Sequence, residues 1–370
     1  MYLHTLLSLI ALVDSATADT IDRRPIVSRY NPVRNASSTS TPMQVGNGYF
    51  AFGADITGMQ TFQPFAIMSS WAWKNDSLPA GKTMQDVENY RGALWDNHGR
   101  LVQYNFGGAD TQIQQWLISN PNRVNLGRIG LLFKGENAEV LNVTEADIAD
   151  ARQELDLWTG TLTSQFSFKG TSVQVNTTAG QDSDSVYFTV SSDLLSTNSL
   201  AVFLDFPWSD GKSKFSAPFV GTYNATSNHT TELDDANNQI AHTIGDSTFY
   251  TYLNGDVFDI SRDSISAHHY TITPEVVSNQ TTFAIGITFS LDDSFNAIPS
   301  PDVAISASTE AWNSYWSESG FVDVVSGSTD ERADELQRRI ILSRYLMRVN
   351  EAGDSPPQEV SSLFIWSHSW

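Results

Sequence analysis

TLTSQFSFKGTSVQVNT, residues 161–177, is the stretch that decides the fold of this chain. Its second half, Thr171 to Thr177, alternates, so Val173 and Val175 should lie on one face of a β-strand. Thr161 to Phe168 has the composition of another strand, and the turn pair Lys169-Gly170 separates the two. The stretch therefore predicts two short strands with a turn between them.

The same pattern recurs on both sides of this stretch. Further candidate strands are Gly48 to Ile56, Arg128 to Phe133, Glu139 to Val143, Ser185 to Val190, Leu200 to Phe206, Thr248 to Leu253, His268 to Thr273 and Thr282 to Ser290. Turn-rich spacers separate these strands, without intervening helical patterns. The chain is therefore expected to be mainly β, with residues 19–300 forming a large β-sandwich instead of a parallel α/β sheet.

Composition excludes several classes of function. The chain has 370 residues, no cysteine and a formal net charge of -21. Without cysteine, neither a disulfide nor a thiolate can contribute. The negative charge argues against nucleic acid or an anionic membrane surface as partner, since both need basic patches.

The first 18 residues are expected to be a secretory signal peptide. Leu6 to Val13 form a short apolar core, and Ala16-Thr17-Ala18 has the small-x-small form of a cleavage site. No apolar run is long enough to span a bilayer. Seven Asn-x-Ser/Thr sequons support export: Asn35, Asn75, Asn142, Asn176, Asn224, Asn228 and Asn279. These features predict an extracellular, secreted glycoprotein.

Helical patterns are confined to three places. Gln112 to Ser119 predicts a short helix that ends at Asn120-Pro121. Residues 301–328 predict a helical linker with Trp312, Tyr315 and Trp316 on one face. Residues 329–370 begin with a longer helix that runs to about Asn350.

The longer helix has a start signal and an apolar face. Ser328-x-x-Glu331 predicts a capping box at its beginning. Its apolar residues keep helical spacing: Leu336, Ile340, Ile341, Tyr345, Leu346 and Val349. This stripe is expected to need a packing partner.

Aromatic and acidic residues supply the candidates for sugar chemistry. Trp71 and Trp73 are two residues apart, so in a strand they would face the same way and could contact sugar rings; ordinary core packing is the alternative. Glycosidic hydrolysis normally takes two carboxylates, but with 42 acidic residues a pair alone identifies nothing. Asp55, Asp205 and Glu359 lie beside apolar or Gly/Pro-rich segments, where burial could raise a carboxyl pKa; solvated surface acids are the alternative.

Metal and cofactor chemistry finds no support in the sequence. His268 and His269 are adjacent on a predicted strand, so their rings should point opposite ways, which makes a poor metal site. No zinc-protease, EF-hand, P-loop or nucleophile-elbow motif occurs, so no metal and no cofactor are expected. Gly46-Asn47-Gly48 predicts a tight turn before a strand.

Five stretches together resemble a secreted family of six-hairpin glycosidase-like proteins, distantly similar to glycoside hydrolase family 65. They are TPMQVGNGYFAF with ADITGMQTF at 41–62, SSWAW at 69–73, NPNRVNLGRIG at 120–130, LDLWTG at 155–160, and LSRYL at 342–346 leading to PPQE at 356–359. The stretches follow the family's order, and the match covers nearly all of residues 25–360.

The resemblance implies a β-supersandwich, a helical linker and an (α/α)6 toroid with the active site at its mouth. It further implies inverting acid/base hydrolysis in intact relatives, with carbohydrate as the partner. Glu359 becomes the catalytic candidate, and Asn47, Trp71, Trp73 and Gln358 become substrate-binding candidates.

Val360 to Trp370 departs from the family pattern, and further toroid helices are not found in the sequence. The toroid is therefore expected to be truncated, and this chain to be inactive or incomplete as a hydrolase. A non-catalytic, carbohydrate-binding sandwich module and a defective product without stable function stay open as alternatives.

Overall fold

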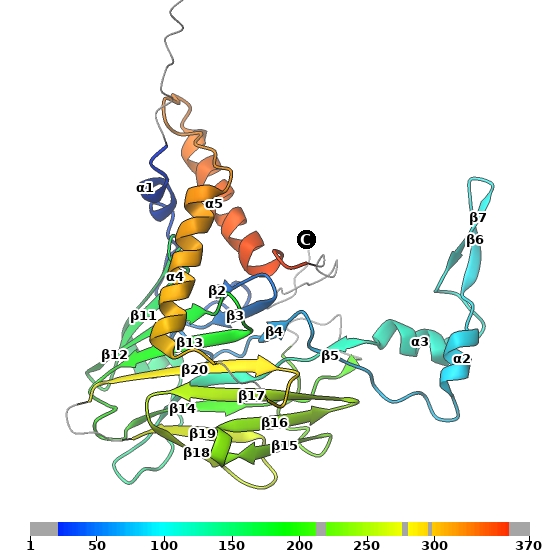
Figure 1. Ribbon diagram of the computed structural model, residues 1–370, viewed down its shortest axis with the longest axis horizontal. Coiled ribbons are helices and arrows are strands. Elements are labelled where there is room, and N and C mark those ends of the chain that lie inside the picture. The colour runs from blue at the N-terminus through cyan, green and yellow to red at the C-terminus, as the bar shows by residue number, and fades with distance from the viewer. Residues whose placement is uncertain (1–20, 212–219, 276–279, 295–297, 355–370) are drawn as a thin grey trace, which may run out of the picture.

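The computed structural model describes residues 21–211, 220–275, 280–294 and 298–354, and these form a mainly β structure (Figure 1). Helices stand on one side of a large antiparallel sheet, and a slender arm projects from its edge (Figure 1). Within the described ranges, no helix is both long and apolar enough to cross a membrane.

The largest sheet has nine antiparallel strands in the order β1-β10-β11-β12-β13-β20-β17-β16-β15. Their bounds are β1 Val33–Arg34, β10 Ile148–Asp156, β11 Thr161–Phe168, β12 Thr171–Ala179, β13 Ser185–Ser191, β15 His229–Asp234, β16 Gln239–Ile244, β17 Ser247–Gly255 and β20 Thr282–Ser290. In β12, Val173 and Val175 are both fully buried, as the alternation predicts. Lys169 and Gly170 both have positive φ angles, 49° and 82°, which suits a two-residue hairpin turn between β11 and β12.

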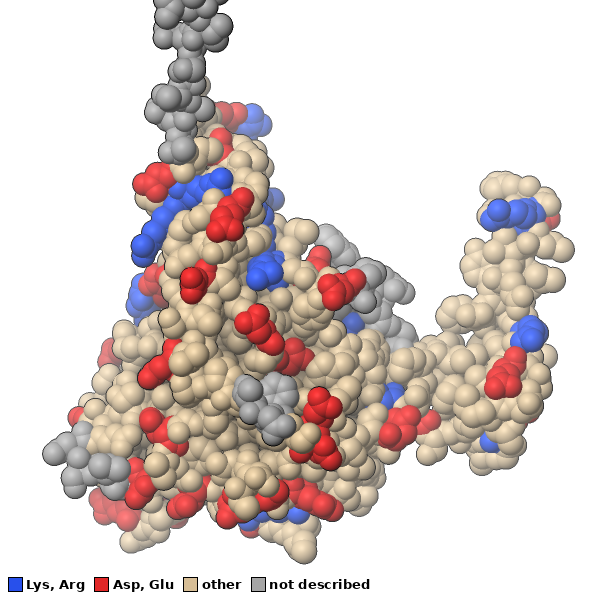
Figure 2. Space-filling model, viewed as in Figure 1, with Lys and Arg blue, Asp and Glu red and all other residues tan. Residues whose placement is uncertain are grey.

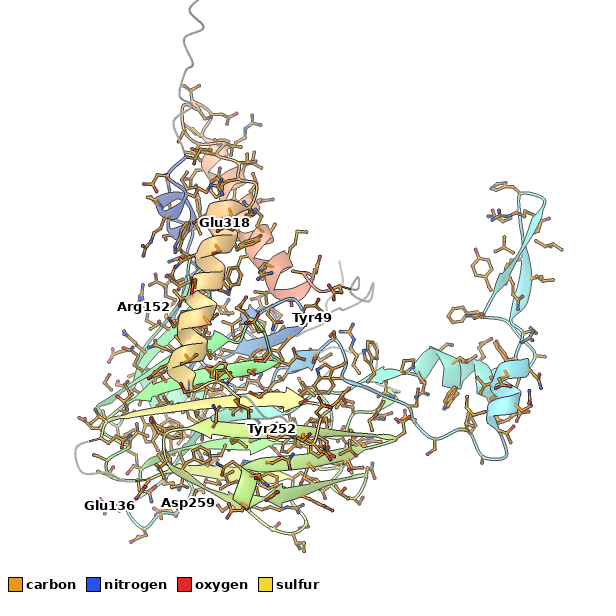
Figure 3. The ribbon with its side chains drawn as sticks, viewed as in Figure 1. Tyr49, Glu136, Arg152, Tyr252, Asp259 and Glu318 are labelled. Atoms are coloured by element: carbon orange, nitrogen blue, oxygen red, sulfur yellow. The ribbon has the colours of Figure 1, made fainter. Side chains whose placement is uncertain are left out.

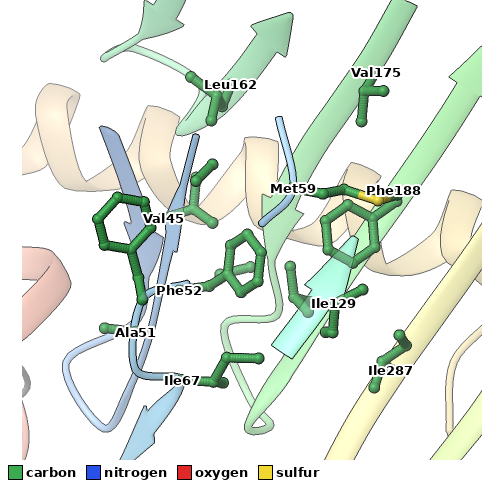
Figure 4. Packing of buried hydrophobic residues seen from close by; sticks show 14 of the residues in the cluster. Val45, Ala51, Phe52, Met59, Ile67, Ile129, Leu162, Val175, Phe188 and Ile287 are labelled. Atoms are coloured by element: carbon green, nitrogen blue, oxygen red, sulfur yellow. The ribbon is translucent and has the colours of Figure 1, made fainter. Parts of the chain in front are cut away.

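A four-stranded sheet, in the order β18-β19-β14-β9, packs against the nine-stranded sheet. Its strands are β9 Arg128–Phe133, β14 Leu200–Asp205, β18 Phe258–Arg262 and β19 His269–Pro274. Figure 4 shows Ile129 of β9 beside Phe188 of β13 and Ile287 of β20, within one continuous apolar cluster. The two sheets therefore share a core, which is the arrangement of a β-sandwich.

Three small sheets complete the β structure. They are β2 Met43–Gly46 with β3 Phe50–Ala54 and β4 Met68–Ser69, then β5 Trp73–Lys74 with β8 Asn122–Arg123, then β6 Ala93–Asn97 with β7 Arg100–Tyr104. The β6–β7 hairpin, together with α2 Met84–Asn89 and α3 Thr111–Ser119, forms the projecting arm (Figure 1). Helix α3 agrees with the predicted helix to within one residue, and Asp110 caps its first turn through Ile113 N–H.

The remaining helices are α1 Arg23–Ser28, α4 Pro301–Glu318 and α5 Arg332–Asn350. Trp312 and Trp316 of α4 are buried and Tyr315 packs against the same cluster, so the predicted helical face is confirmed. Trp312 stacks on Tyr345 of α5 with ring centroids 4.6 Å apart.

Helix α5 has the packing partner that its apolar stripe requires, namely α4 and the β2–β3 sheet. Tyr345 donates a hydrogen bond to the Gln44 carbonyl oxygen at 2.9 Å, and Asn350 donates to the Gln44 side-chain oxygen at 2.9 Å. Leu336 and Leu346 are exposed, so the buried face is narrower than the predicted stripe.

Two local predictions are wrong. Helix α5 begins after Glu331 with no side-chain cap, and Asp330, not Ser328, accepts the Arg332 N–H, so the predicted capping box does not form. Residues 139–143 do not form a strand, because only Val140 bridges to Lys134. No prediction was made for β10, β15, β16 or the β6–β7 hairpin.

Candidate functional site

Two adjoining hollows open where the β2–β3 turn, the turn after β4 and the loop before β13 converge. Their volumes are about 390 and 270 Å3, and both are lined by Trp71, Asp182, Ser183 and Asp184. The first is also lined by Asn47, Tyr49, Ser70 and Gln181, and the second by Phe289, Ser290, Leu291 and Asp292. We call the two together the Trp71 hollow.

Trp71 is held at this hollow by its indole N–H. Its Nε1 donates to Asp184 Oδ2 at 2.5 Å, and the Ser69 hydroxyl donates to the same oxygen. Burial raises the pKa of the Asp184 carboxyl, although its hydrogen bonds from Ser69 and Trp71 favour the ionised form. The ring of Trp71 is therefore oriented without a ligand.

Asn47 holds the β2–β3 turn against the loop that carries Asp184. Its side-chain oxygen accepts the N–H groups of Tyr49 and Phe50 at 2.9 and 2.8 Å. Its side-chain N–H groups donate to the carbonyl oxygens of Gly180 and Ser183 at 3.0 and 3.1 Å. The predicted turn is confirmed; these contacts are all to the backbone, and substrate binding by Asn47 stays a prediction.

Trp73 lies apart from Trp71. A turn separates the two, because Trp71 precedes β5 while Trp73 lies within it, so the premise that both lie on one strand is wrong. Trp73 donates its indole N–H to the Ser70 carbonyl oxygen at 2.8 Å, and the Arg123 guanidinium lies 5.1 Å from its ring centre. Trp73 does not line the hollow, so its sugar-binding role stays a prediction and is separate from that of Trp71.

The segment that follows α5, up to Asp354, lies against the β2–β3 turn at this hollow. The Asp354 N–H donates to the Tyr49 hydroxyl at 3.1 Å, and Gly48 N–H donates to the Val349 carbonyl oxygen at 2.9 Å. Tyr49 lies beside the end of α5 in Figure 3. Gln358 and Glu359 lie outside the described residues, so their predicted roles are untested.

The other two candidate acids lie elsewhere. Asp55 is buried, and it accepts hydrogen bonds from Thr57, Phe62 and Gln63, so it organises its own loop. Burial raises the pKa of Asp55, as the sequence suggests. Burial also raises the pKa of Asp205 at the end of β14 to about 7, although nearby Arg128 acts in the opposite direction. Neither carboxyl lines the Trp71 hollow.

Asp184, Asp182, Asp292 and Tyr49 were not predicted as site residues. Asp182 and Asp184 fall in the polar run Gln181-Asp182-Ser183-Asp184, immediately before a strand that was predicted. The position of these two carboxylates, directly before a buried strand, is the sequence signal that indicates Asp182 and Asp184. Among the described residues, no group of three or more His, Cys, Asp or Glu could hold a metal ion.

A buried cluster of three histidines lies between β15, β16 and the start of β19. The rings of His229 and His268 have centroids 4.0 Å apart, and His229 Nδ1 lies 2.8 Å from His242 Nε2. His269 instead pairs with Asp263 at 2.7 Å, so the adjacent pair contacts different groups, as predicted. Burial, and the proximity of His268, lower the pKa of His229 to about 4; burial also lowers that of His242.

This cluster is expected to make stability fall as the pH is lowered. In the unfolded chain His229 takes up a proton below about pH 6.5, whereas in the folded protein it does so only near pH 4. The stability that neutral His229 contributes is therefore complete above about pH 6.5 and is lost as the pH falls from about 6.5 to about 4. This decrease in the free energy of unfolding should be on the order of 2 to 3 kcal/mol. Asp205 contributes to the pH dependence of stability in the opposite direction, because its raised pKa makes folding relatively more favourable at low pH.

Urea unfolding at pH 7 and at pH 4 measures the His229 contribution as a difference between variants. The change in stability from pH 7 to pH 4 should be less favourable in the wild type than in His229→Asn, because asparagine does not titrate, whereas the opposing Asp205 contribution is common to both proteins. His98→Asn, on the exposed turn between β6 and β7, is the matched control and should show the same change as the wild type. An equal change in the wild type and in His229→Asn would contradict the assignment.

Three solved structures similar to this chain bear the names of glycoside-processing proteins. A protein assigned as a kojibiose phosphorylase, from human microbiome, is 13% identical with a TM-score of 0.48, over 91% of this chain and 45% of that one. A bacterial glucoamylase complexed with acarbose is 9% identical with a TM-score of 0.38, over 62% and 35%. A glycoside hydrolase family 81 protein from Clostridium thermocellum is 9% identical with a TM-score of 0.21, over 78% and 23%.

The chain spans less than half the length of each of these proteins. No protein-family model matches the sequence, and no curated protein sequence matches it. At these identities and TM-scores, the likeness carries no argument about the activity of this chain.

Proposed function

We propose that this chain is the β-sandwich part of a secreted, six-hairpin glycosidase-like protein, and that the Trp71 hollow binds a neutral sugar. The observation that carries the proposal is the indole of Trp71, fixed by Asp184 at the wall of a hollow where aromatic and polar residues meet. A fixed aromatic ring can pack against the C–H face of a sugar without losing freedom on binding. Secretion and N-glycosylation are part of this proposal; Asn35, Asn75, Asn142, Asn224 and Asn228 are exposed and Asn176 is partly exposed, while Asn279 lies outside the described residues.

The charge of the lining favours neutral sugars over anionic ones. Asp182, Asp184 and Asp292 all line the Trp71 hollow, and none of its described lining residues is Lys or Arg. Ionised carboxylates accept hydrogen bonds from sugar hydroxyls, whereas they repel uronates and sulfated sugars. Neutral hexose units are therefore the class of ligand that the hollow fits best.

We extend the proposal to Glu359 as one carboxylate of an inverting pair and to Gln358 as a sugar contact. Asp354 touches Tyr49 at the hollow, and the five residues from there to Glu359 span at most about 18 Å. The two carboxyls of an inverting glycosidase stand roughly 6.5 to 9.5 Å apart. Chain length therefore permits Glu359 to reach a sugar bound beside Trp71.

The binding test uses the whole chain and a panel of α- and β-linked glucose disaccharides, with glucuronate as the anionic comparison. Trp71→Ala should weaken binding of the preferred disaccharide by about tenfold or more, since a tenfold change needs only about 1.4 kcal/mol. Trp71→Phe keeps a ring but loses the N–H to Asp184, so an intermediate loss is expected. Binding is measured by isothermal titration calorimetry.

Ile265→Ala is the control, because Ile265 is 93% exposed and lines neither part of the hollow. Affinity that survives Trp71→Ala would refute the sugar site. Turnover of a disaccharide that Glu359→Gln abolishes would support the catalytic extension, whereas binding without any turnover would favour the non-catalytic module.

A further inference from the structure

The arm, residues 77–120, carries a small sheet that has no partner strand in the described structure. β6 and β7 pair only with each other, from Ala93 opposite Tyr104 to Asn97 opposite Arg100. The hairpin stands clear of the sandwich in Figure 2. An isolated two-stranded sheet is at best marginally stable in water, so this hairpin is suited to a surface that covers it.

Both faces of the hairpin carry exposed apolar side chains, although Gln103 and Asp96 share the reverse face with Leu94 and Leu101. Trp95 lies opposite Val102 on one face, while Leu94 and Leu101 point to the other face, because successive residues alternate. Trp95 is 59% exposed and Leu101 is 66% exposed. The large apolar side chains exposed on the arm are Met84, Leu94, Trp95, Leu101, Tyr104 and Phe106.

Exposed apolar side chains on both faces fit a protein partner better than a sugar. A sugar ring needs one flat aromatic face, whereas an apolar reverse face would still lie in water. Enclosure of the hairpin by protein covers both faces. The exposed Leu94 and Leu101 on the reverse face therefore favour a protein partner over a sugar.

The charge of the arm permits a second copy of this chain as that partner. The arm contains three basic and four acidic side chains, Lys82, Arg91 and Arg100 with Asp86, Glu88, Asp96 and Asp110, so its net charge is -1, against -21 for the whole chain. Two strongly acidic sandwiches repel each other, whereas an almost neutral arm can approach an acidic body at little electrostatic cost. Figure 2 shows acidic side chains spread over the sandwich.

The root of the arm offers a place for such a hairpin. A hollow of about 940 Å3 lies between α3 and the sandwich, with Pro79, Trp116 and Trp208 among its lining residues and Asp76, Gln112 and Gln115 beside them. We infer that this chain forms a twofold dimer, in which the β6–β7 hairpin of each copy enters the hollow at the root of its partner's arm. A twofold axis makes the two contacts identical and leaves neither hairpin uncovered.

The area available is sufficient for a stable dimer. A fully buried aromatic side chain covers roughly 150 to 250 Å2, so the two half-exposed aromatics and two leucines of the hairpin offer on the order of 300 Å2 per arm. Counted on both partners, the two reciprocal contacts reach the roughly 1,200 Å2 at which specific interfaces begin.

The test measures the mass of the whole chain by sedimentation equilibrium over a range of concentrations. The wild type should be a dimer, and Trp95→Ser combined with Leu101→Ser should raise the dimer dissociation constant at least tenfold. Val257→Ser is the matched control, because Val257 is 68% exposed at the turn before β18. It should leave the dimer unchanged.

A second variant keeps the hairpin intact and changes the receiving hollow. Gln115→Arg places a longer, charged side chain in that hollow and should also weaken the dimer at least tenfold. A monomeric wild type would overturn the inference, as would dimerisation that survives the hairpin variant or Gln115→Arg. Loss of polysaccharide binding in the Trp95→Ser and Leu101→Ser variant of a monomeric chain would instead assign the arm to sugar.

Discussion

Replacing Gly160 by alanine is expected to lower the free energy of unfolding by about 3 kcal/mol or more, since it adds left-handed backbone strain to an overpacked contact. Gly160 has a φ angle of +66°, and an added Cβ would lie 2.0 Å from Nε1 of Trp312. Trp312 cannot move aside easily, because it stacks on Tyr345 and is buried. The substitution should therefore separate α4 and α5 from the β10–β11 turn.

Gly170→Ala is the control for the backbone part of this effect. Gly170 also has a positive φ angle, +82°, but an added Cβ would meet nothing within 4 Å. Its loss should be about 1 to 2 kcal/mol, the strain of one left-handed residue. Urea unfolding gives both values, and hydrogen exchange should become faster in α4 and α5 for Gly160→Ala alone. Equal losses in the two variants would rule out the contact with Trp312.

Replacing Asn47 by alanine is expected to cost about 3 to 4 kcal/mol, because four hydrogen bonds worth about 1 kcal/mol each disappear together. Asn47 is buried, so the N–H groups of Tyr49 and Phe50 and the carbonyl oxygens of Gly180 and Ser183 would lose their partner. The loop that carries Asp184 would then be free to move away from Trp71. Sugar binding at the Trp71 hollow should fall with stability.

Asn47→Asp tests the donating side of the turn. The aspartate keeps an oxygen for the N–H groups of Tyr49 and Phe50, but its second oxygen would face the carbonyl oxygens of Gly180 and Ser183 without a proton between them. Its stability and its sugar affinity should therefore fall at least as far as those of the alanine variant. Unchanged affinity in both variants would show that the loop does not depend on Asn47.

Strands with ordinary apolar alternation could be predicted from the sequence. Val173 and Val175 in β12 and Phe166 in β11 follow the rule that every second side chain is buried. The face of α4 that carries Trp312 and Trp316 follows helical spacing equally well. In these elements the buried side chains named here are apolar, so the spacing of buried positions can be recognised in the amino-acid sequence.

β15, β16 and β10 were missed because polar side chains interrupt or replace the apolar ones in their interiors. In β15 the buried residues are His229 and Thr231, and in β16 fully buried His242 stands between Ile240 and Ile244. In β10 the buried residues are Gln153 and Leu155, and the register shifts between Ala149 and Arg152. Histidine and glutamine are normally exposed, so a strand that buries them against each other shows no hydrophobic alternation.

The site could be predicted only in part, for a related reason. Trp71 is an uncommon residue type and can be noticed alone, whereas Asp184 is one of 42 acidic residues. What distinguishes Asp184 is its contact with Trp71, which is 113 positions away in the sequence. Long-range pairing of this kind is set by the sheet order and has no local signature.

The contact between α5 and β2 fixes when the protein can finish folding during synthesis. Tyr345 and Gln44 are 301 positions apart, so at about 5 to 20 residues per second the ribosome needs roughly 15 to 60 seconds to make the second after the first. Throughout that interval β2 and β3 lack the helix that covers them, while the hairpins from β10 to β13 can already pair locally. β2 and β3 are therefore synthesised early but reach their final packing late, and chaperones can bind them during that interval.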